Sequence, residues 1–166
     1  MIRKALDTDL QAIVDIYNQA INARCCTGDT ECFSVDERLS WFNQHSQRSN
    51  PKTPMFVFET EQGVIAYSYI SLYRPGRKAF ESVGEISYYV DFNHHRKGIG
   101  RLLLEHLIDE AKKIGYTHLI GILLDCNLKS VALLEKYGFC RWGVMPGIAH
   151  IDDNHYSHLY YGLSLL

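Results

Sequence analysis

The sequence lacks any apolar run near the roughly 20 residues that a membrane-spanning helix needs. Its first residues, MIRKALDTD, contain no apolar segment of the kind found in a signal peptide. It also lacks a strong charge of either sign, because 17 basic and 19 acidic side chains leave a net charge of −2. Such a balance gives no global field to attract nucleic acid or a membrane surface. We therefore expect a cytoplasmic protein that has neither of them as a partner.

The cysteines show no disulfide framework. There are five, an odd number, and none of them forms a CxxC pair. Small disulfide-stapled proteins carry even numbers of cysteines, so we predict free thiols and a reducing compartment. A metal site is not predicted either, because the candidate ligands His155 and His158 have opposite strand parity. Cys126 has no assigned base beside it and is a poor candidate for a nucleophile.

Repeats and low-complexity segments are also missing, and 166 residues suit one domain spanning residues 1–166. Period-2 patterns predict strands, and apolar residues at 3–4 spacing predict helices. Strands are predicted at 2–5, 55–60, 64–73, 84–91, 118–124, 141–149 and 156–163; helices are predicted at 7–21, 35–45, 99–114 and 127–137. This order indicates an α/β (α+β) chain built around one central sheet.

One stretch carries the strongest signal, "HHRKGIGRLLLEHLIDEAKKIG" at residues 94–115. A basic cluster and two glycines, Gly98 and Gly100, stand where an amphipathic helix begins. The first turn of a helix offers unpaired N–H groups and the positive end of its dipole. Glycine lets a large anion approach the backbone closely. We therefore predict an anion site on the N–H groups of residues 96–101.

Two common nucleotide motifs do not fit this stretch. The dinucleotide fingerprint GxGxxG fails because Leu103 takes the place of the third glycine, and the phosphate loop GxxxxGK[ST] is absent. Two interpretations remain: a basic Gly-x-Gly turn that binds one pair of phosphates, or a turn with a structural role only.

Several segments in the same order resemble the GCN5-related N-acetyltransferases (GNAT), within them the phosphinothricin N-acetyltransferase-like branch. "HRKGIG" (95–100) is similar to that family's pyrophosphate loop, and "RKAF" with "EISYYV" (77–90) to the branch signature. "IRKALDTDLQAIVDIYNQAI", "DTECFSVDERLSWF" and "NLKSVALLEKYGF" also look like segments of that branch. The resemblance implies a mixed, mostly antiparallel sheet of about seven strands, splayed between strands 4 and 5 and flanked by about four helices. It also implies acetyl-CoA as co-substrate, no metal, and a homodimer.

The resemblance also implies the residues that bind the cofactor. The pyrophosphate would lie on the loop at 96–101, and the pantetheine arm would pair with the backbone of the fourth strand. Asn127 would bond the arm, although a helix cap alone would also explain an asparagine there. His95 departs from the usual Arg or Gln, and its imidazole is charged only below its pKa. The full cofactor set is Tyr88, Tyr89, Val90, His95, Arg96, Lys97, Gly98, Ile99, Gly100, Arg101, Asn127 and Ser130.

Glu85 is the predicted catalytic residue. Strand alternation places Glu85, Ser87 and Tyr89 on one face. Acetyl transfer needs a neutral amine, so a carboxylate that takes a proton, directly or through water, suits the chemistry. The resemblance places the family's catalytic carboxylate here. Without it, an exposed glutamate on a strand would be the plainer interpretation.

The substrate residues implied by the resemblance are Arg77, Phe33 and Phe80. An Arg fork suits a substrate carboxylate, whereas a turn arginine and core aromatics are the alternatives. Leu134 stands where the wider superfamily has a tyrosine acid, and Tyr137 is expected to pack. The roles of His150, His155 and His158 near the C-terminus stay open.

We thus predict an enzyme that moves an acetyl group from acetyl-CoA to the primary amine of a small molecule, such as an amino acid or analogue (phosphinothricin or methionine sulfoximine). A protein N-terminus or lysine as acceptor is the first alternative, and it requires an open groove. A non-catalytic acyl-CoA sensor is the second, suggested by His95 and Leu134. The presence of Glu85 favours an enzyme.

Overall fold

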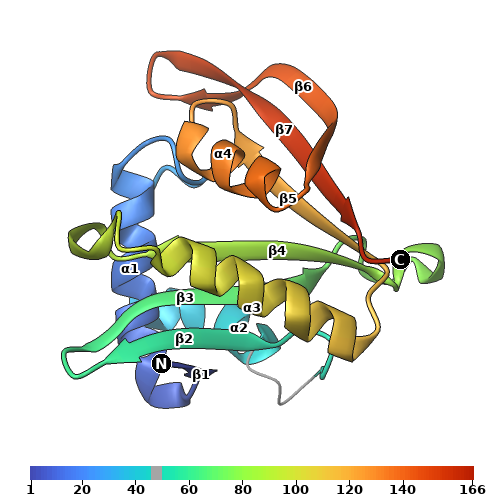
Figure 1. Cartoon of the computed structure of the whole chain (residues 1–166). Coiled ribbons are helices and arrows are strands. Elements are labelled where there is room, and N and C mark those ends of the chain that lie inside the picture. The colour runs from blue at the N-terminus through green and yellow to red at the C-terminus, as the bar shows by residue number, and fades with distance from the viewer. Residues whose placement is uncertain (46–49) are drawn as a thin grey trace.

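A computed structural model describes residues 1–45 and 50–166 and contains one seven-stranded sheet (Figure 1). The strands lie in the order β1-β2-β3-β4-β5-β7-β6. They are β1 (Ile2–Lys4), β2 (Met55–Thr60), β3 (Gly63–Leu72), β4 (Val83–Val90), β5 (His118–Leu124), β6 (Cys140–Ile151) and β7 (Asn154–Ser164). The α-helices are α1 (Leu10–Asn22), α2 (Val35–His45), α3 (Ile99–Ile114) and α4 (Leu128–Lys136).

The sheet splays at its single parallel pair, β4 and β5. Only Val83–Ile86 of β4 pair with His118–Gly121 of β5, whereas β3 pairs with β4 from Gly84 to Val90. Beyond Ile86 and Gly121 the two strands diverge, so the backbone of Ser87–Val90 keeps a ladder partner on one side only. The predicted mixed sheet with a splay between strands 4 and 5 is confirmed.

Helices cover both faces of the sheet (Figure 1). Helices α1 and α2 pack against β3 and each other on one face, and α3 packs against β3 and β4 on the opposite face. Burial of these apolar faces is the main force that holds the layers together. One core surrounds Leu107, Leu119 and Leu134, and a second surrounds Ile13, Phe42 and Tyr67.

The elements agree closely with the predicted ranges. The apolar residues at 3–4 spacing from which α1 is predicted are Leu10, Ile13, Val14, Tyr17 and Ile21, and all five are buried. In α3, apolar spacing indicates a buried stripe of Ile99, Leu102, Leu103, Leu107, Ala111 and Ile114, but Leu104 is fully buried and Leu102 is only half-buried. The reason is that α3 contacts two clusters, one through Leu103 and one through Leu104. None of the described helices is long and apolar enough to cross a membrane.

The cysteine prediction was wrong for one pair. Cys25 and Cys126 form a disulfide between residues 101 positions apart, with their Cα atoms 5.8 Å from each other. Cys26, Cys32 and Cys140 are free thiols. The pairing was invisible in the sequence because it depends on topology: the loop after α1 runs past the end of β5.

Candidate active site

A groove of about 520 Å³ lies at the open end of the β4–β5 splay. The end of β4, the segment 92–101 and the first turn of α4 form its floor and walls, and the loop after α1 closes one side. The described residues that line it include no Asp or Glu, so its charged side chains are basic. The basic residues are His94, His95, Arg96, Arg101 and Lys129. A wall of this charge suits a ligand that carries several phosphates.

The glycine turn at the start of α3 supplies the backbone of an anion site. Arg96 and Gly98 adopt left-handed conformations with φ of +63° and +77°. Gly98 is the N-cap of α3, and no side chain caps the helix there. The first N–H groups of α3 are therefore left for an external acceptor. A Cβ on Gly98 would meet no protein atom within 4 Å, so packing inside the protein does not explain the glycine. The residues present fit a pyrophosphate.

The predicted loop residues differ in what they offer. His95 Nε2 lies 3.0 Å from the Val90 carbonyl oxygen, so this nitrogen carries the proton and only Nδ1 is left for a ligand. Ile99 is buried in the core beside Leu103, which leaves its backbone N–H for a phosphate. Lys97 is exposed and does not line the groove, whereas Lys129, which the sequence analysis missed, does.

The opposite wall is the first turn of α4. The Asn127 side-chain oxygen accepts a hydrogen bond from the Ser130 N–H at 3.4 Å, so the asparagine caps the helix. Both residues also line the groove, which leaves the Asn127 amide NH₂ available to a ligand. Tyr88 lies beneath them, and burial raises the pKa of its hydroxyl to about 12. Helix capping and cofactor binding are compatible at Asn127.

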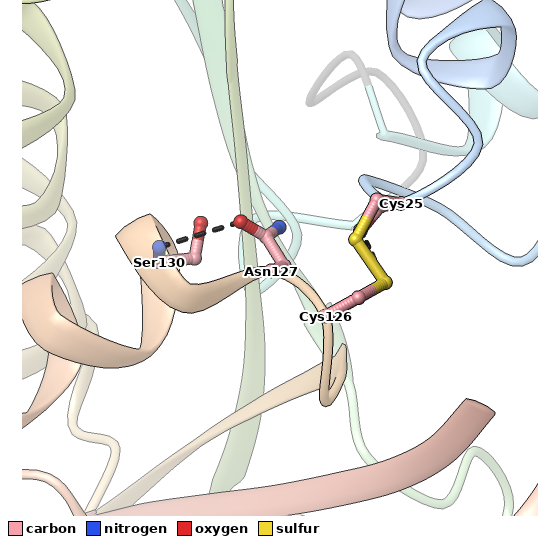
Figure 2. Close-up of a disulfide and its surroundings, with 4 residues drawn as sticks. All are labelled: Cys25, Cys126, Asn127 and Ser130. Carbon is pink, nitrogen blue, oxygen red and sulfur yellow. Dashed lines mark hydrogen bonds between the residues drawn. A yellow bond between two sulfur atoms is a disulfide. The ribbon is translucent and has the colours of Figure 1, made fainter.

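The disulfide borders this wall (Figure 2). Cys126 immediately precedes Asn127, and Cys25 belongs to the loop after α1, so the bond ties the two sides of the groove together. Cys25 and Cys26 both line the groove. A smaller cavity of about 60 Å³ continues from Cys26 between Ser87 on β4 and Gly121 on β5.

Glu85 lies on β4 with its side chain on the face that α1 and α2 cover. Register places it opposite Ser71 on β3 and Ile120 on β5. Burial raises its pKa above the ordinary carboxylate value. Within residues 1–45 and 50–166, no lysine or arginine forms an ion pair with it. A carboxylate that is partly desolvated and has no basic partner is a stronger base than one in water.

An aromatic cluster shares this face and was not predicted. The Arg38 guanidinium lies 3.8 Å from the Trp41 ring centroid and under 5 Å from the rings of Tyr17 and Phe33. Tyr69 packs edge-on against Trp41 and lies opposite Ser87 in the sheet register, two residues from Glu85. The available sequence signal was Arg38 followed at i+3 by Trp41, which places both on one side of α2. Phe33 is thus a neighbour of Arg38.

The other predicted substrate residues lie elsewhere. Arg77 and Phe80 are exposed on the turn between β3 and β4, where Phe80 packs edge-on against Tyr73. Neither lines the groove, and the structure does not bring them together with Phe33. The sequence placed all three around the substrate, and this placement stays a prediction.

The two positions of α4 and its C-cap considered for a general acid, Leu134 and Tyr137, place no acidic group in the groove. Leu134 is buried, lines the smaller cavity and has no ionisable side chain. Tyr137 donates a hydrogen bond to Glu105 at 2.5 Å, which raises the pKa of the phenol. It lines neither cavity.

His150 and His155 face each other across the β6–β7 hairpin. In the described part of the chain, no three or more His, Cys, Asp or Glu are grouped to hold a metal ion.

The fold and the groove define a class of acyl-CoA-dependent transferase, and comparison with known proteins agrees. Residues 14–139 match the model of the acetyltransferase (GNAT) family. The chain belongs to this family and to its phosphinothricin acetyltransferase-like branch, and it is an N-acetyltransferase.

Three similar proteins illustrate the relationship. YwnH of Bacillus subtilis (strain 168), a candidate phosphinothricin acetyltransferase, is 36% identical over 94% of this chain and 93% of its own. The L-amino acid N-acyltransferase MnaT of Escherichia coli (strain K12) is 31% identical over 89% of this chain and 83% of its own. A phosphinothricin acetyltransferase from Sinorhizobium meliloti, solved in complex with acetyl-CoA, superposes with a TM-score of 0.91 at 26% identity, over 99% of this chain and 88% of that one.

Proposed function

We propose that the protein transfers the acetyl group of acetyl-CoA to the primary amine of a small molecule, an amino acid or an analogue such as phosphinothricin or methionine sulfoximine. One observation carries the proposal. The basic groove and the half-buried Glu85 carboxylate, which has no ion-pair partner among the described residues, flank the same strand, β4. The names of the relatives support the chemical class of the acceptor.

The groove would hold acetyl-CoA, which supplies an activated acyl group. The N–H groups of the turn at 96–101 would bind the pyrophosphate, helped by Arg96, Arg101 and Lys129. The unpaired side of β4 from Tyr88 to Val90 would bind the amide-bearing arm as a strand binds its neighbour. Asn127 and Ser130 would hold the arm from the other wall.

Glu85 would act as the general base. An α-amino group has a pKa of about 8, so it reaches the site protonated at pH 7. The raised pKa of the Glu85 carboxyl narrows the gap between base and ammonium, which favours proton transfer, directly or through one water. The departing CoA thiol has a pKa of about 8.5, so its thiolate takes a proton from the solvent or the substrate ammonium. A dedicated acid at position 134 is then not required.

Arg77 would pair with the carboxylate of the substrate, and Phe33 and Phe80 would border the pocket. Arg77 lies on an exposed turn, so its guanidinium can swing toward an anion.

We also propose that the protein forms a homodimer. The outer edge strand β6 exposes large apolar side chains, Trp142, Val144, Met145 and Ile148, which a second copy could cover. Sedimentation at several protein concentrations tests this point.

The deciding experiment measures release of free CoA thiol from acetyl-CoA in the presence of a panel of amines. We expect turnover with α-amino acids or their analogues and much less with peptides that carry a free N-terminus or lysine. Turnover with peptides alone would favour a protein acetyltransferase. Binding of acetyl-CoA without turnover on any amine would favour an acyl-CoA sensor.

A further inference from the structure

The disulfide Cys25–Cys126 borders the groove that would hold coenzyme A. We propose that this disulfide is an exchange site for that thiol: coenzyme A becomes bound to Cys25 as a mixed disulfide, and Cys126 leaves as a free thiol. The inference rests on the proposed function, because it needs coenzyme A in the groove. It adds a covalent modification site that acetyl transfer itself does not use.

The position of the bond supports this proposal. Cys25 follows α1, on one face of the sheet, and Cys126 joins β5 to α4, on the other half of the splay. Figure 2 shows the bond beside the first turn of α4, next to Asn127 and Ser130, which line the groove. The bond is thus part of the wall of the cofactor groove.

The two sulfurs are not equally placed. Cys25 lines the groove together with Tyr88–Val90, whereas Cys126 does not line it. Attack of a thiolate on a disulfide proceeds in line, with the leaving sulfur on the far side. A thiol that approaches from the groove therefore meets Cys25 and displaces Cys126. The basic lining at Arg96, Arg101 and Lys129 attracts the phosphates of coenzyme A and so raises its local concentration in the groove.

The step balances without an oxidant or a reductant. The coenzyme A thiol loses its proton, and its sulfur forms a bond to Sγ of Cys25. The Cys25–Cys126 bond breaks, its electron pair goes to Cys126, and that sulfur takes up the proton. One disulfide is present before and after. Acetyl transfer supplies the thiol, because each turnover releases coenzyme A in this groove.

The free cysteines cannot substitute for this pair. Cys26 also lines the groove, but it is a thiol, and burial raises its pKa. Cys32 and Cys140 are exposed thiols. A thiol joins coenzyme A only if an oxidant removes two electrons. Without oxygen or another oxidant, attachment is therefore restricted to Cys25 and Cys126.

The adduct would make the enzyme sensitive to its own product under oxidising conditions. Coenzyme A held by a covalent bond fills the groove and excludes acetyl-CoA. A small dithiol reverses the state by reducing the mixed disulfide. Once Cys25 and Cys126 are both thiols, coenzyme A dissociates normally.

The test uses the full chain, first oxidised mildly and then freed of oxidant. It is incubated anaerobically with coenzyme A, quenched in acid, and analysed by intact mass and peptide mapping. We expect one coenzyme A per chain on the peptide containing Cys25, and a new free thiol at Cys126. Acetyl-CoA, whose sulfur is blocked, should give no adduct. Pantetheine, which lacks the nucleotide, should react about 10-fold more slowly or worse, because the groove does not position it.

Matched variants sharpen the result. Cys26→Ser should keep the adduct, and Cys126→Ser, which has no disulfide, should form none anaerobically. The proposal is overturned by an adduct on another cysteine, by equal rates for coenzyme A and pantetheine, or by a Cys25–Cys126 pair that does not form on oxidation. Calorimetry on the same sample distinguishes failure of the disulfide exchange from failure of the proposed function. Coenzyme A bound without an adduct removes this inference alone, whereas no binding at all removes the proposed function and this inference together.

Discussion

The two sides of β4 are built in different ways. On the groove side, the groups proposed to bind the cofactor are largely backbone atoms of one continuous turn, 96–101, and the N-terminus of α4 faces them. On the other side, the groups are side chains from α1, α2 and two strands, with Glu85 beside a cluster of rings around Arg38. A cofactor common to many enzymes can be bound by a local motif. A particular amine needs side chains brought together by the whole fold, which explains why the acceptor is harder to identify.

The largest effect should come from a change at Glu85, on the side of β4 where the acceptor amine would bind (the acceptor side). Glu85→Gln should lower kcat by about 100-fold or more, the usual scale for a general base, and leave the Kd for acetyl-CoA unchanged. Burial raises the Glu85 pKa, so wild-type activity should fall as the pH drops through a value above that of an ordinary carboxylate. That acid limb should disappear in the variant. Steady-state kinetics from pH 5 to 9 measure both effects.

Glu81→Gln is the control for this prediction, because Glu81 is an exposed carboxylate on the preceding turn. It should change kcat very little. An equal loss of kcat in the two variants, or a higher Kd for acetyl-CoA in Glu85→Gln, would contradict the separation of cofactor binding from catalysis on the two sides of β4.

A change on the groove side should instead weaken the binding of acetyl-CoA. Gly98→Val places a branched side chain where a phosphate must approach, at a backbone conformation with φ of +77°. We expect the Kd for acetyl-CoA to rise about 30-fold, or about 2 kcal/mol, by calorimetry. Gly63→Val is the matched control, since Gly63 also has a positive φ and open space but is the first residue of β3, after the β2–β3 turn. If both variants bind equally well, the loop does not hold the pyrophosphate.

Two arginines allow the acceptor side to be resolved further. Arg77→Ala should raise KM about 10-fold for an amino acid and leave KM for its amide nearly unchanged, because a charge-assisted pair of about 1.5 kcal/mol is lost. Arg38→Ala should lower the melting temperature, since three rings lose a contact, while the ratio between acid and amide stays the same. The reverse result would assign the substrate carboxylate to Arg38.

The smallest effect is expected at Tyr137. Its hydroxyl is bonded to Glu105 and lines neither cavity. Tyr137→Phe should therefore change kcat by less than about 10-fold, or 1.4 kcal/mol. Loss of activity with intact folding and cofactor binding would make this tyrosine the acid that protonates the thiolate.

The sequence predicted the features that depend on neighbouring residues. The α3 glycine turn, the Asn127 cap and the shared face of Glu85 and Tyr89 all follow from spacing within a few positions. The disulfide, the Arg38 cluster and the role of Lys129 in the groove depend on contacts between distant segments, and they were missed. The apolar stripe on α3 was misplaced at Leu102 and Leu104 for the same reason, since two clusters contact that helix.

The short β4–β5 seam gives the sheet an edge in its interior. From Ser87 to Val90, β4 has no neighbouring strand on the side facing the splay, where the Val90 carbonyl oxygen accepts a hydrogen bond from His95 Nε2. Outer edges invite other chains to pair with them, and proteins protect such edges with charges or bulges. This inner edge is not on the outer rim of the sheet, because β5, β7 and β6 continue the sheet beyond it, and it opens onto the groove that would hold the linear arm of coenzyme A. Its amides should exchange with deuterium quickly in the free protein and slowly once that arm is bound, a direct report on occupancy.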